Sequence, residues 1–318
     1  MKIVLTGSIA YDYLMTFPGY FRDHILPDHL DNISLSFLVD SMVRQRGGVA
    51  PNIAFNLALL GESPILLGTV GDDFDIYRIW LESKGINTTY IKVISGEFTA
   101  SFFANTDLSN AQIASFYTGA MAYAADLSLQ EVMGEKPDLV VISPNDPTAM
   151  ERYTIECQDL GIPYLYDPSQ QIVRIKPEIL KQGVIGATHL FVNEYEFELL
   201  QKHTGLSASE IKEQINILVV TLGEKGASVF QNGKEFSIGA VKPVKVADPT
   251  GVGDAFRAGF LKGYSMEFDP QTCGQMGALA ATYCLEQRGT QNHSYTVSEF
   301  VKRYRTIFQD QGVLDALL

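Results

Sequence analysis

Short strand-like runs alternate with helical patterns along most of the chain, and this alternation constrains the fold more than any other feature of the sequence. The strand-like runs are rich in Ile, Leu, Val and Tyr and comprise residues 3–6, 65–69, 139–143, 164–166, 190–193 and 217–221. Helical patterns lie between them, for example over 52–60 and 149–160. Such a βαβ order is typical of a parallel sheet covered by helices on both faces. The sequence therefore predicts an α/β fold with a mainly parallel central sheet.

Two stretches interrupt this alternation with strand-like sequence that has no helix of its own. Residues 34–44 alternate as a strand would, and residues 99–105 with 112–117 resemble the two strands of a hairpin. We expect these stretches to form a small β-sheet lid inserted into a single α/β unit. The predicted lid comprises residues 15–46 and 97–118, and the predicted large domain comprises residues 1–14, 47–96 and 119–318.

Composition and charge argue for a cytoplasmic protein that binds neither nucleic acid nor membrane. Of the 318 residues 46% are hydrophobic, enough for one large α/β domain with an elaboration or for two domains. The 24 basic and 37 acidic residues give a net charge of −13, which opposes binding to nucleic acid and anionic lipid. The three cysteines form no CxxC pair, and no apolar run reaches membrane-spanning length.

The segment Asp248–Phe256 places two glycines and a carboxylate where a helix over 251–265 is predicted to begin. The first N–H groups of a helix have no partner within it, and the helix dipole adds partial positive charge, so such a turn can hold an anion. Asp254 can accept the proton of an attacking hydroxyl, which together with the anion site indicates phosphoryl transfer. The alternative is an ordinary helix whose first turn contains an acidic residue that complements the dipole.

A second glycine pair, Gly47 and Gly48, leads into the predicted helix that begins at Asn52. A backbone without side chains lets a polar ligand approach that helix N-terminus, although the glycines could equally serve only to turn the chain. Asp12 follows the first strand, at the carboxyl edge where α/β sheets bind ligands. Its carboxylate could accept two hydrogen bonds from a vicinal diol, whereas a lone aspartate is more often a solvated turn residue.

Asn193 and Glu196 follow another strand at the same edge. Glu196 can reach a hydrated Mg²⁺, and Asn193 can contact a phosphate or a metal-bound water. The alternative for this pair is a helix cap followed by an exposed acid.

A third segment at that edge contains Thr221, Gly223 and Gly226. The hydroxyl and the glycine backbone suit a nucleotide phosphate, and a plain hairpin turn is the alternative. The chain has neither a P-loop, since Gly233 and Lys234 are followed by Glu235, nor a complete GxGxxG motif.

Four aromatic residues lie on the two predicted hairpin strands of the lid: Phe102, Phe103, Phe116 and Tyr117. Packing within a sheet is the common use of such side chains. A purine, however, is recognised by aromatic faces, and offset stacking adds roughly 0.5 to 1.5 kcal/mol beyond the burial of area. The rings therefore either pack within the lid or cover a purine.

Taken in order, these motifs resemble the ribokinase-like, or phosphofructokinase-B type, family of carbohydrate kinases, and the resemblance covers essentially the whole chain. The matching segments are 7–12, 47–48 with 52, 68–73, 193–196, 221–226 and 248–256. Within that family, segments 34–40, 112–117, 167–171 and 254–260 are similar to the bacterial adenosine kinases. The resemblance implies a three-layer α/β sandwich with a β-sheet lid, and a nucleoside as the substrate.

By this resemblance, Asp254 is the base that removes the proton from the 5′-hydroxyl of the nucleoside, and Gly251, Val252 and Gly253 form the anion hole for the γ-phosphoryl group. Phe102 and Phe116 would enclose adenine. The residues that match nucleoside-binding positions are Ser8, Asp12, Ser36, Gly47, Gly48, Asn52, Phe102, Phe116, Gln170 and Gln171.

The same resemblance implies an ATP site. The residues that match it are Asn193, Thr221, Gly223 and Gly226, with Glu196 holding Mg²⁺ through water. Asp248 lies where many relatives bind a monovalent cation such as K⁺. Where sugar kinases usually have Asp-Thr-x-Gly-Ala-Gly-Asp, this chain has Pro249 and Val252, as the adenosine kinases do.

We therefore expect an adenosine kinase that transfers the γ-phosphate of Mg-ATP to adenosine and yields AMP and ADP, a reaction of purine salvage. One alternative is a kinase of this family for another nucleoside or for a sugar such as fructose. Another is a nucleoside-binding sensor without turnover, which would have no need of Asp254 as a base. The expected partners are adenosine and ATP, with a second copy of the chain bound through the lid in a homodimer.

Overall fold

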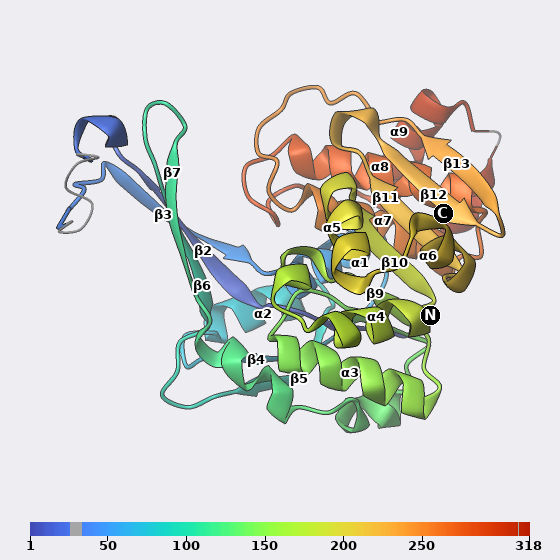
Figure 1. The fold of residues 1–318 in the computed structure, drawn as a ribbon. Coiled ribbons are helices and arrows are strands. Elements are labelled where there is room, and N and C mark those ends of the chain that lie inside the picture. The colour runs from blue at the N-terminus through green and yellow to red at the C-terminus, as the bar shows by residue number, and fades with distance from the viewer. Residues whose placement is uncertain (26–33, 311) are drawn as a thin grey trace.

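Nine strands form one sheet at the centre of the computed structural model, which describes residues 1–25, 34–310 and 312–318 (Figure 1). The strand order is β13-β12-β11-β10-β9-β8-β1-β4-β5, and neighbours are parallel except for the β11–β12 and β12–β13 pairs. The strands are β1 (Ile3–Thr6), β4 (Ile65–Val70), β5 (Asn87–Val93), β8 (Leu139–Ile142), β9 (Tyr164–Tyr166), β10 (His189–Asn193), β11 (Ile217–Thr221), β12 (Ala227–Gln231) and β13 (Lys234–Ile238). All six predicted strands are confirmed, and the more polar β5, β12 and β13 were not predicted.

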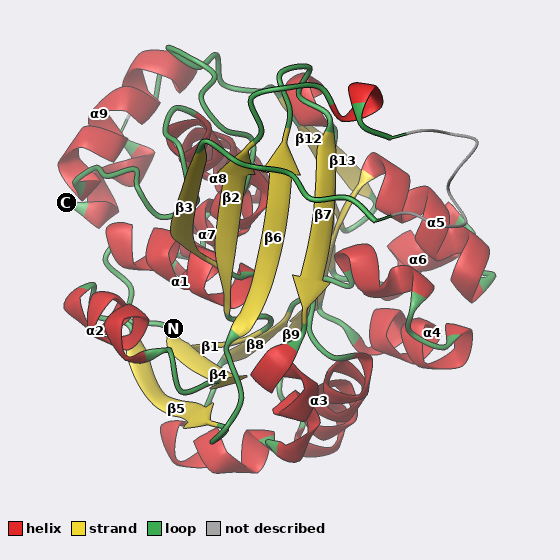
Figure 2. Cartoon of the chain, turned by 90° about the vertical axis from the view of Figure 1, so that its left-hand side faces the viewer, coloured by secondary structure: helices red, strands yellow, loops and turns green. Residues whose placement is uncertain are grey.

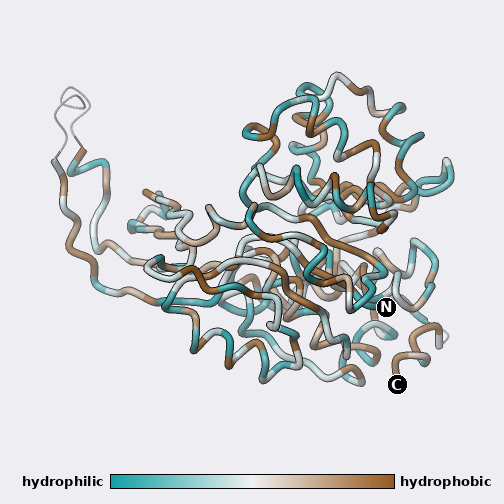
Figure 3. The backbone as a smooth tube through the Cα atoms, turned by 90° about the horizontal axis from the view of Figure 1, so that it is seen from below, coloured by the Kyte–Doolittle hydropathy of each residue, from teal (hydrophilic) through white to brown (hydrophobic). Residues whose placement is uncertain are grey.

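Alternate side chains of this sheet enter two separate hydrophobic cores. Ile3 and Leu5 of β1 face one core, whereas Val4 between them faces the other. Because side chains along a strand point to opposite faces in turn, a strand that is apolar at every position is buried on both sides. In Figure 3 hydrophobic segments of the backbone, coloured brown, run through the middle of the body, and the lid extends from the body as a thin arm.

Helices cover both faces of the sheet and complete the predicted three-layer sandwich. The first core is closed by α1 (Val49–Leu59), α2 (Asp75–Ser83), α7 (Val252–Ser265), α8 (Pro270–Leu285) and α9 (Val297–Phe308). The second is closed by α3 (Pro147–Leu160), α4 (Pro177–Gly186), α5 (Glu194–Thr204) and α6 (Ala208–Gln214). Helix α1 begins before the predicted Asn52, since Pro51 is tolerated in a first turn that needs no N–H donor. Within the described ranges, no helix is both long and apolar enough to cross a membrane.

A separate four-stranded sheet forms the lid, which is seen face on in Figure 2 and stands away from the body in Figure 1. Its order is β3-β2-β6-β7, with β2 (Ala10–Thr16), β3 (Ser41–Gly47), β6 (Ala100–Thr106) and β7 (Gln112–Tyr117). The predicted hairpin is confirmed as β6 and β7. The strand predicted over 34–44 begins only at Ser41, and β2 was not predicted as a strand. The boundary expected between residues 14 and 15 therefore falls inside β2.

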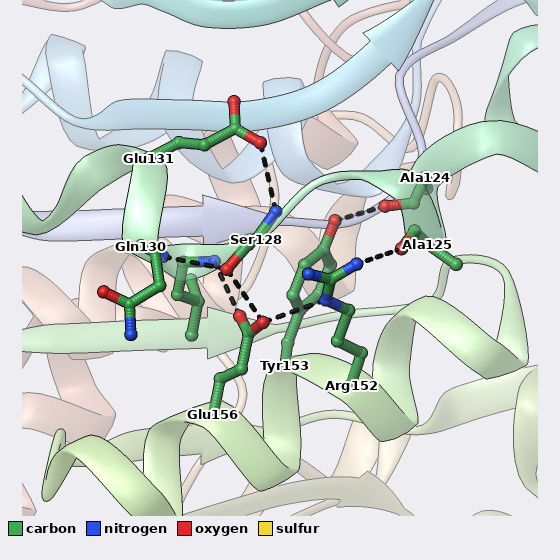
Figure 4. Close-up of polar contacts among 9 residues, drawn as sticks. Ala124, Ala125, Ser128, Gln130, Glu131, Arg152, Tyr153 and Glu156 are labelled. Carbon is green, nitrogen blue, oxygen red and sulfur yellow. Dashed lines mark hydrogen bonds and ion pairs between the residues drawn. The ribbon is translucent and has the colours of Figure 1, made fainter.

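The chain that returns from the lid is fastened to α3 by a polar cluster (Figure 4). Glu156 of α3 accepts hydrogen bonds from the Ser128 hydroxyl at 2.8 Å and from the Leu129 N–H at 2.7 Å. Arg152, one turn earlier, donates to Glu156 at 2.9 Å and to the Ala125 carbonyl at 2.8 Å. These bonds fix the two 3₁₀ helices, η3 (Gly119–Asp126) and η4 (Leu129–Glu135), that connect β7 to β8.

The start of α1 is packed against the short connection between β1 and β2. Gly48 has a φ of +93°, and a Cβ at this position would lie 2.6 Å from the Ala10 nitrogen and 2.8 Å from Ile9 Cα. Ser8 accepts hydrogen bonds from the first N–H groups of α1, with its hydroxyl from Val49 at 3.2 Å and with its carbonyl from Ala50. This helix N-terminus is therefore satisfied by protein atoms.

This packing predicts that Gly48→Ala destabilises the protein more than a positive φ alone explains. Gly61→Ala is the matched control, because Gly61 has a φ of +83° but open space where a Cβ would stand. The control should lose about 1 kcal/mol from left-handed strain, and Gly48→Ala about 2 kcal/mol more from the collision. Urea unfolding measures both. Equal losses would show that Gly48 is needed for its conformation and not for close packing.

Candidate active site

The first turn of α7 is an uncapped helix N-terminus with unused donors. Gly251 is the N-cap with a φ of +77°, and no side chain caps the helix. A Cβ on Gly251 would lie 2.8 Å from Thr290 Cγ2, so this position needs glycine for both conformation and space. Among the described residues, the N–H groups of Gly253 and Asp254 have no acceptor. With the helix dipole behind them, these donors can bind an anion.

Asp254 lies on the same turn and is partly buried. Its carboxylate accepts a hydrogen bond from Asn52 Nδ2 at 2.8 Å, which joins the first turns of α1 and α7. The pKa of Asp254 is raised to about 7, chiefly by burial and also by Asp167 and Asp12, while Arg257 and the Asn52 hydrogen bond oppose the rise. A carboxyl that titrates near neutral pH is suited to accept a proton during a reaction.

Arg257, one turn along α7, places a guanidinium beside the glycine turn. It is paired with the buried Asp167 after β9, with Nη2 2.7 Å from Oδ1 and Nε 2.6 Å from Oδ2. Its remaining nitrogen, Nη1, faces Gly253, because a Cβ on that glycine would lie 2.8 Å from it. A nearly buried cation oriented by a carboxylate therefore stands next to the free N–H groups.

Asp12 belongs to the lid and not to the carboxyl edge of β1 where the sequence placed it. The chain leaves β1 at Thr6 and enters β2 at Ala10, so Asp12 is the third residue of a lid strand. Gly47 of β3 leaves room for it, since a Cβ there would collide with the Asp12 carboxylate. Burial and the neighbouring Asp248 raise the pKa of Asp12 to about 6.

Asp12, Phe102 and Phe116 form one row across the lid. Asp12 of β2 is in register with Phe102 of β6, which is in register with Phe116 of β7. Residues directly opposite each other on paired strands point to the same face, so the carboxylate and the two rings share a face. Phe103 points to the other face and stacks on Tyr13 with ring centroids 4.8 Å apart. Phe116 remains 48% exposed and open to a ligand.

Four further residues predicted for the nucleoside site lie outside the lid strands that carry this row. The Ser8 hydroxyl is used at the start of α1, and Ser36 is exposed in an irregular segment before β3. Gln170 is exposed in the 3₁₀ helix η5 (Ser169–Val173), whereas Gln171 beside it is buried and its Oε1 has no hydrogen-bond partner in the described structure.

The predicted ATP residues gather at the carboxyl ends of β10 and β11. Asn193 and Thr221 are in register on these adjacent strands. Asn193 and Glu196 exchange hydrogen bonds of 2.8 Å as a capping box for α5, so the helix-cap alternative is confirmed. Gly223 and Gly226 form the turn between the antiparallel β11 and β12, which confirms the hairpin alternative. Neither arrangement prevents a phosphate from binding at this edge.

The two carboxylates predicted to bind metal ions, Glu196 and Asp248, already accept hydrogen bonds from the protein. Glu196 accepts from the Ser169 hydroxyl at 2.9 Å as well as from Asn193, and such a held carboxylate fits a hydrated Mg²⁺. Over the described ranges, no three His, Cys, Asp or Glu side chains form a metal cluster. Both oxygens of Asp248 accept backbone N–H groups, from Thr250 at 2.9 Å and Gly289 at 3.0 Å.

Known proteins are similar to this chain in fold and sequence. The family model described as pfkB family carbohydrate kinase matches residues 12–296. The chain belongs to the pfkB family of carbohydrate kinases. A nucleoside kinase of Methanocaldococcus jannaschii is 30% identical over 95% of this chain and 96% of its own, and a cytidine kinase of Thermococcus kodakarensis is 26% identical over 84% and 97%. The structure of Burkholderia thailandensis nucleoside kinase in complex with inosine has a TM-score of 0.86 and 36% identity, covering 96% of this chain and 97% of that one.

Sequence reasoning missed two residues of this pfkB-family site. Arg257 lies three residues after the predicted Asp254 on the same helix. Since residues three apart on a helix are neighbours, this spacing could have indicated that the Arg257 side chain lies beside the glycine turn. Gln291, in the segment between α8 and α9, is 2% exposed and donates to Asn52 Oδ1 at 3.0 Å. No motif marks this glutamine, since its partner is 239 residues away.

The raised pKa of Asp254 predicts that Asp254→Asn stabilises the fold of this pfkB-family protein at alkaline pH. An acid whose folded-state pKa is raised is stabilising below its unfolded value of 3.8, and that stability is lost as pH rises through about 7. The variant should therefore melt roughly 3 °C above the native protein at pH 8, with a smaller gain at pH 5. Thermal denaturation of Glu198→Gln, an exposed acid on α5, is the control and should show no such pH-dependent gain. A native protein as stable as Asp254→Asn at pH 8 would contradict the argument.

Proposed function

We propose that this protein is a nucleoside kinase that transfers the γ-phosphate of Mg-ATP to the 5′-hydroxyl of adenosine. The observation that carries the proposal is the row of Asp12, Phe102 and Phe116 on one face of the lid, together with the free donors beside Asp254. A relative named nucleoside kinase and a relative solved with inosine support a nucleoside substrate. Each part of the row corresponds to one part of a purine nucleoside.

The lid row recognises the nucleoside through two kinds of contact. The Asp12 carboxylate is suited to accept hydrogen bonds from the 2′- and 3′-hydroxyls of ribose. Because burial reduces the hydrogen bonds that this carboxylate receives from water, a bound diol would supply the missing ones. The rings of Phe102 and Phe116 offer apolar surface to the base. A free sugar has no group that would use these rings, so they favour a nucleoside over ribose or fructose.

The α7 turn performs the chemistry. Asp254 takes the proton of the 5′-hydroxyl while the hydroxyl oxygen forms a bond to the γ-phosphorus and the bond from that phosphorus to the ADP oxygen breaks. The N–H groups of Gly253 and Asp254 donate to the transferred phosphoryl group, and Arg257 Nη1 adds a positive charge beside them. These donors are fixed in place before the reaction, so little reorganisation is needed during it.

The nucleotide is held at the carboxyl ends of β10 and β11. Asn193, Thr221 and the glycine turn contact its phosphates, and Glu196 binds Mg²⁺ through water. When bound there, Mg²⁺ would neutralise phosphate charge and help to orient the γ-phosphate for transfer. Because the chain carries a net charge of −13, local donors of this kind have to provide the attraction for ATP.

A panel of phosphoryl acceptors tests the proposed activity. Adenosine, inosine, cytidine, ribose and fructose are compared by ADP release from Mg-ATP, and adenosine should have the highest kcat/KM. Asp254→Asn should lower kcat by roughly a hundredfold or more and leave adenosine affinity nearly unchanged, because an amide keeps the shape but cannot accept the proton. Faster turnover of ribose or fructose, or an active Asp254→Asn, would reject the corresponding part of the proposal.

Two phenylalanines on opposite faces of the lid test the role of the aromatic row. Phe116→Ala should weaken adenosine binding by roughly 1 kcal/mol, about fivefold, and leave ATP binding unchanged. Phe103→Ala is the matched control, since Phe103 is 37% exposed, lies on the paired strand and faces the other way. Calorimetry measures both ligands on both variants. An equal loss from the two substitutions would mean that the rings act only through the stability of the lid.

A further inference from the structure

Asn52 is the end of a buried chain of hydrogen bonds that begins far from the reacting groups. Gln291 donates through Nε2 to Asn52 Oδ1 at 3.0 Å and to the Tyr77 hydroxyl, and its Oε1 accepts from the Trp80 indole N–H at 3.2 Å. Tyr77 in turn donates to the Gly47 carbonyl at 2.9 Å. Tyr77, Gln291 and Asn52 are 1%, 2% and 5% exposed, so water does not compete for these bonds.

The Trp80 indole N–H and the Gly47 carbonyl, at the far end of this hydrogen-bond chain, determine which group donates in each of its bonds. An indole nitrogen can only donate, so the Gln291 oxygen must face Trp80. A carbonyl can only accept, so Tyr77 must use its proton on Gly47 and can only accept from Gln291. Both conditions place the Gln291 NH₂ group toward Tyr77 and Asn52. The Asn52 oxygen must then face Gln291, and its NH₂ group must face Asp254.

The geometry points to Gln291 as a positioning residue, which holds the Asn52 amide so that its NH₂ group, and not its oxygen, faces the Asp254 carboxylate. The segment around Gln291 contacts this site at each of three successive residues. Gly289 donates to Asp248, Thr290 packs against Gly251, and Gln291 donates to Asn52. Substrate contact is not needed for this role, since Gln291 acts through Asn52.

The orientation of Asn52 matters for the protonation of Asp254. A donor on the carboxylate favours the ionised form, which is the form that can accept a proton, whereas an amide oxygen in the same place would favour the protonated acid. The other groups that face Asp254 are Arg257, which opposes protonation, and Asp167, Asp12 and the Cys284 thiol. Burial already raises the pKa of Asp254 to about 7, so loss of the Asn52 donor would leave the base largely protonated at neutral pH.

Two substitutions at Gln291 test the inference, which rests on the proposed kinase function through its use of Asp254 as the base. Gln291→Met removes the orienting bonds at similar volume. Gln291→Glu replaces the NH₂ donor by a carboxyl oxygen, which in its ionised form can only accept and so draws the NH₂ group of Asn52 away from Asp254. The acidic limb of kcat/KM for adenosine should shift upward by about one pH unit in Gln291→Met and further in Gln291→Glu. At pH 6 the first variant should lose about tenfold relative to the native protein, and near pH 9 it should regain most activity.

Controls separate positioning from stability. Gln275→Met makes the same exchange on α8, where the Gln275 side chain accepts a hydrogen bond from the Tyr304 hydroxyl of α9. This control should leave the pH profile of kcat/KM unchanged. Trp80→Phe removes the indole N–H at one end of the hydrogen-bond chain but keeps a ring against Phe55. The acidic limb of kcat/KM should therefore shift less than in Gln291→Met. Thermal melting checks that each variant is folded at the assay temperature.

A direct titration distinguishes failure of this inference from failure of the proposed function. Carboxyl ¹³C NMR, with the Asp254 signal assigned from its loss in Asp254→Asn, reports the pKa of this group without any substrate. A higher pKa in Gln291→Met supports the inference even if Asp254→Asn retains activity, a result that would reject the base and not the positioning. An unmoved titration in both Gln291 variants, or an equal loss of kcat/KM at every pH, would overturn the role of Gln291.

Discussion

Burial of the parallel sheet on both faces is the constraint on which the rest of this structure depends. Because alternate residues of strands such as β1 and β8 enter different cores, helices must cover both sides, and the connections must run between the ends of the strands. The carboxyl ends of the strands then lie at one edge, where Asn193, Thr221 and Asp167 emerge. The first turns of α1 and α7 meet at the Asn52–Asp254 hydrogen bond, which joins the two helices at the site.

The sequence predicted those parts of the fold that follow from local pattern. Continuous apolar runs identified the central strands, and the glycine turn identified the start of α7. The partly polar β5, β12 and β13 carry no such run, so they were missed. Asp12 was assigned to the edge of β1 because only three residues separate β1 from β2, and nothing local shows that the chain leaves one sheet for another there.

The environment of Asp254 could not be predicted, because its partners come from distant parts of the chain. Asn52 lies 202 residues before it, and Asp167, which orients Arg257, lies 90 residues before that arginine. A buried polar side chain must find a partner wherever the fold brings one, and a glutamine such as Gln291 is unremarkable in sequence. Sequence motifs therefore identified Asp254 as the candidate base, whereas only the three-dimensional arrangement shows which groups surround its carboxylate.

In the proposed function, the two sheets divide recognition of the nucleoside from the chemistry. Asp12, Phe102 and Phe116 stand on the lid, whereas Asp254 and the free N–H groups stand on the body. Residues 7–9 connect β1 to β2 and Gly48 connects β3 to α1, and the close packing of Gly48 against the first connection fixes the two segments relative to each other. Substitutions along the lid strands can therefore alter the contacts to a base without touching the α7 turn. Under the proposed function, this separation gives a physical reason why a relative named cytidine kinase and a relative solved with inosine can both be similar to this chain.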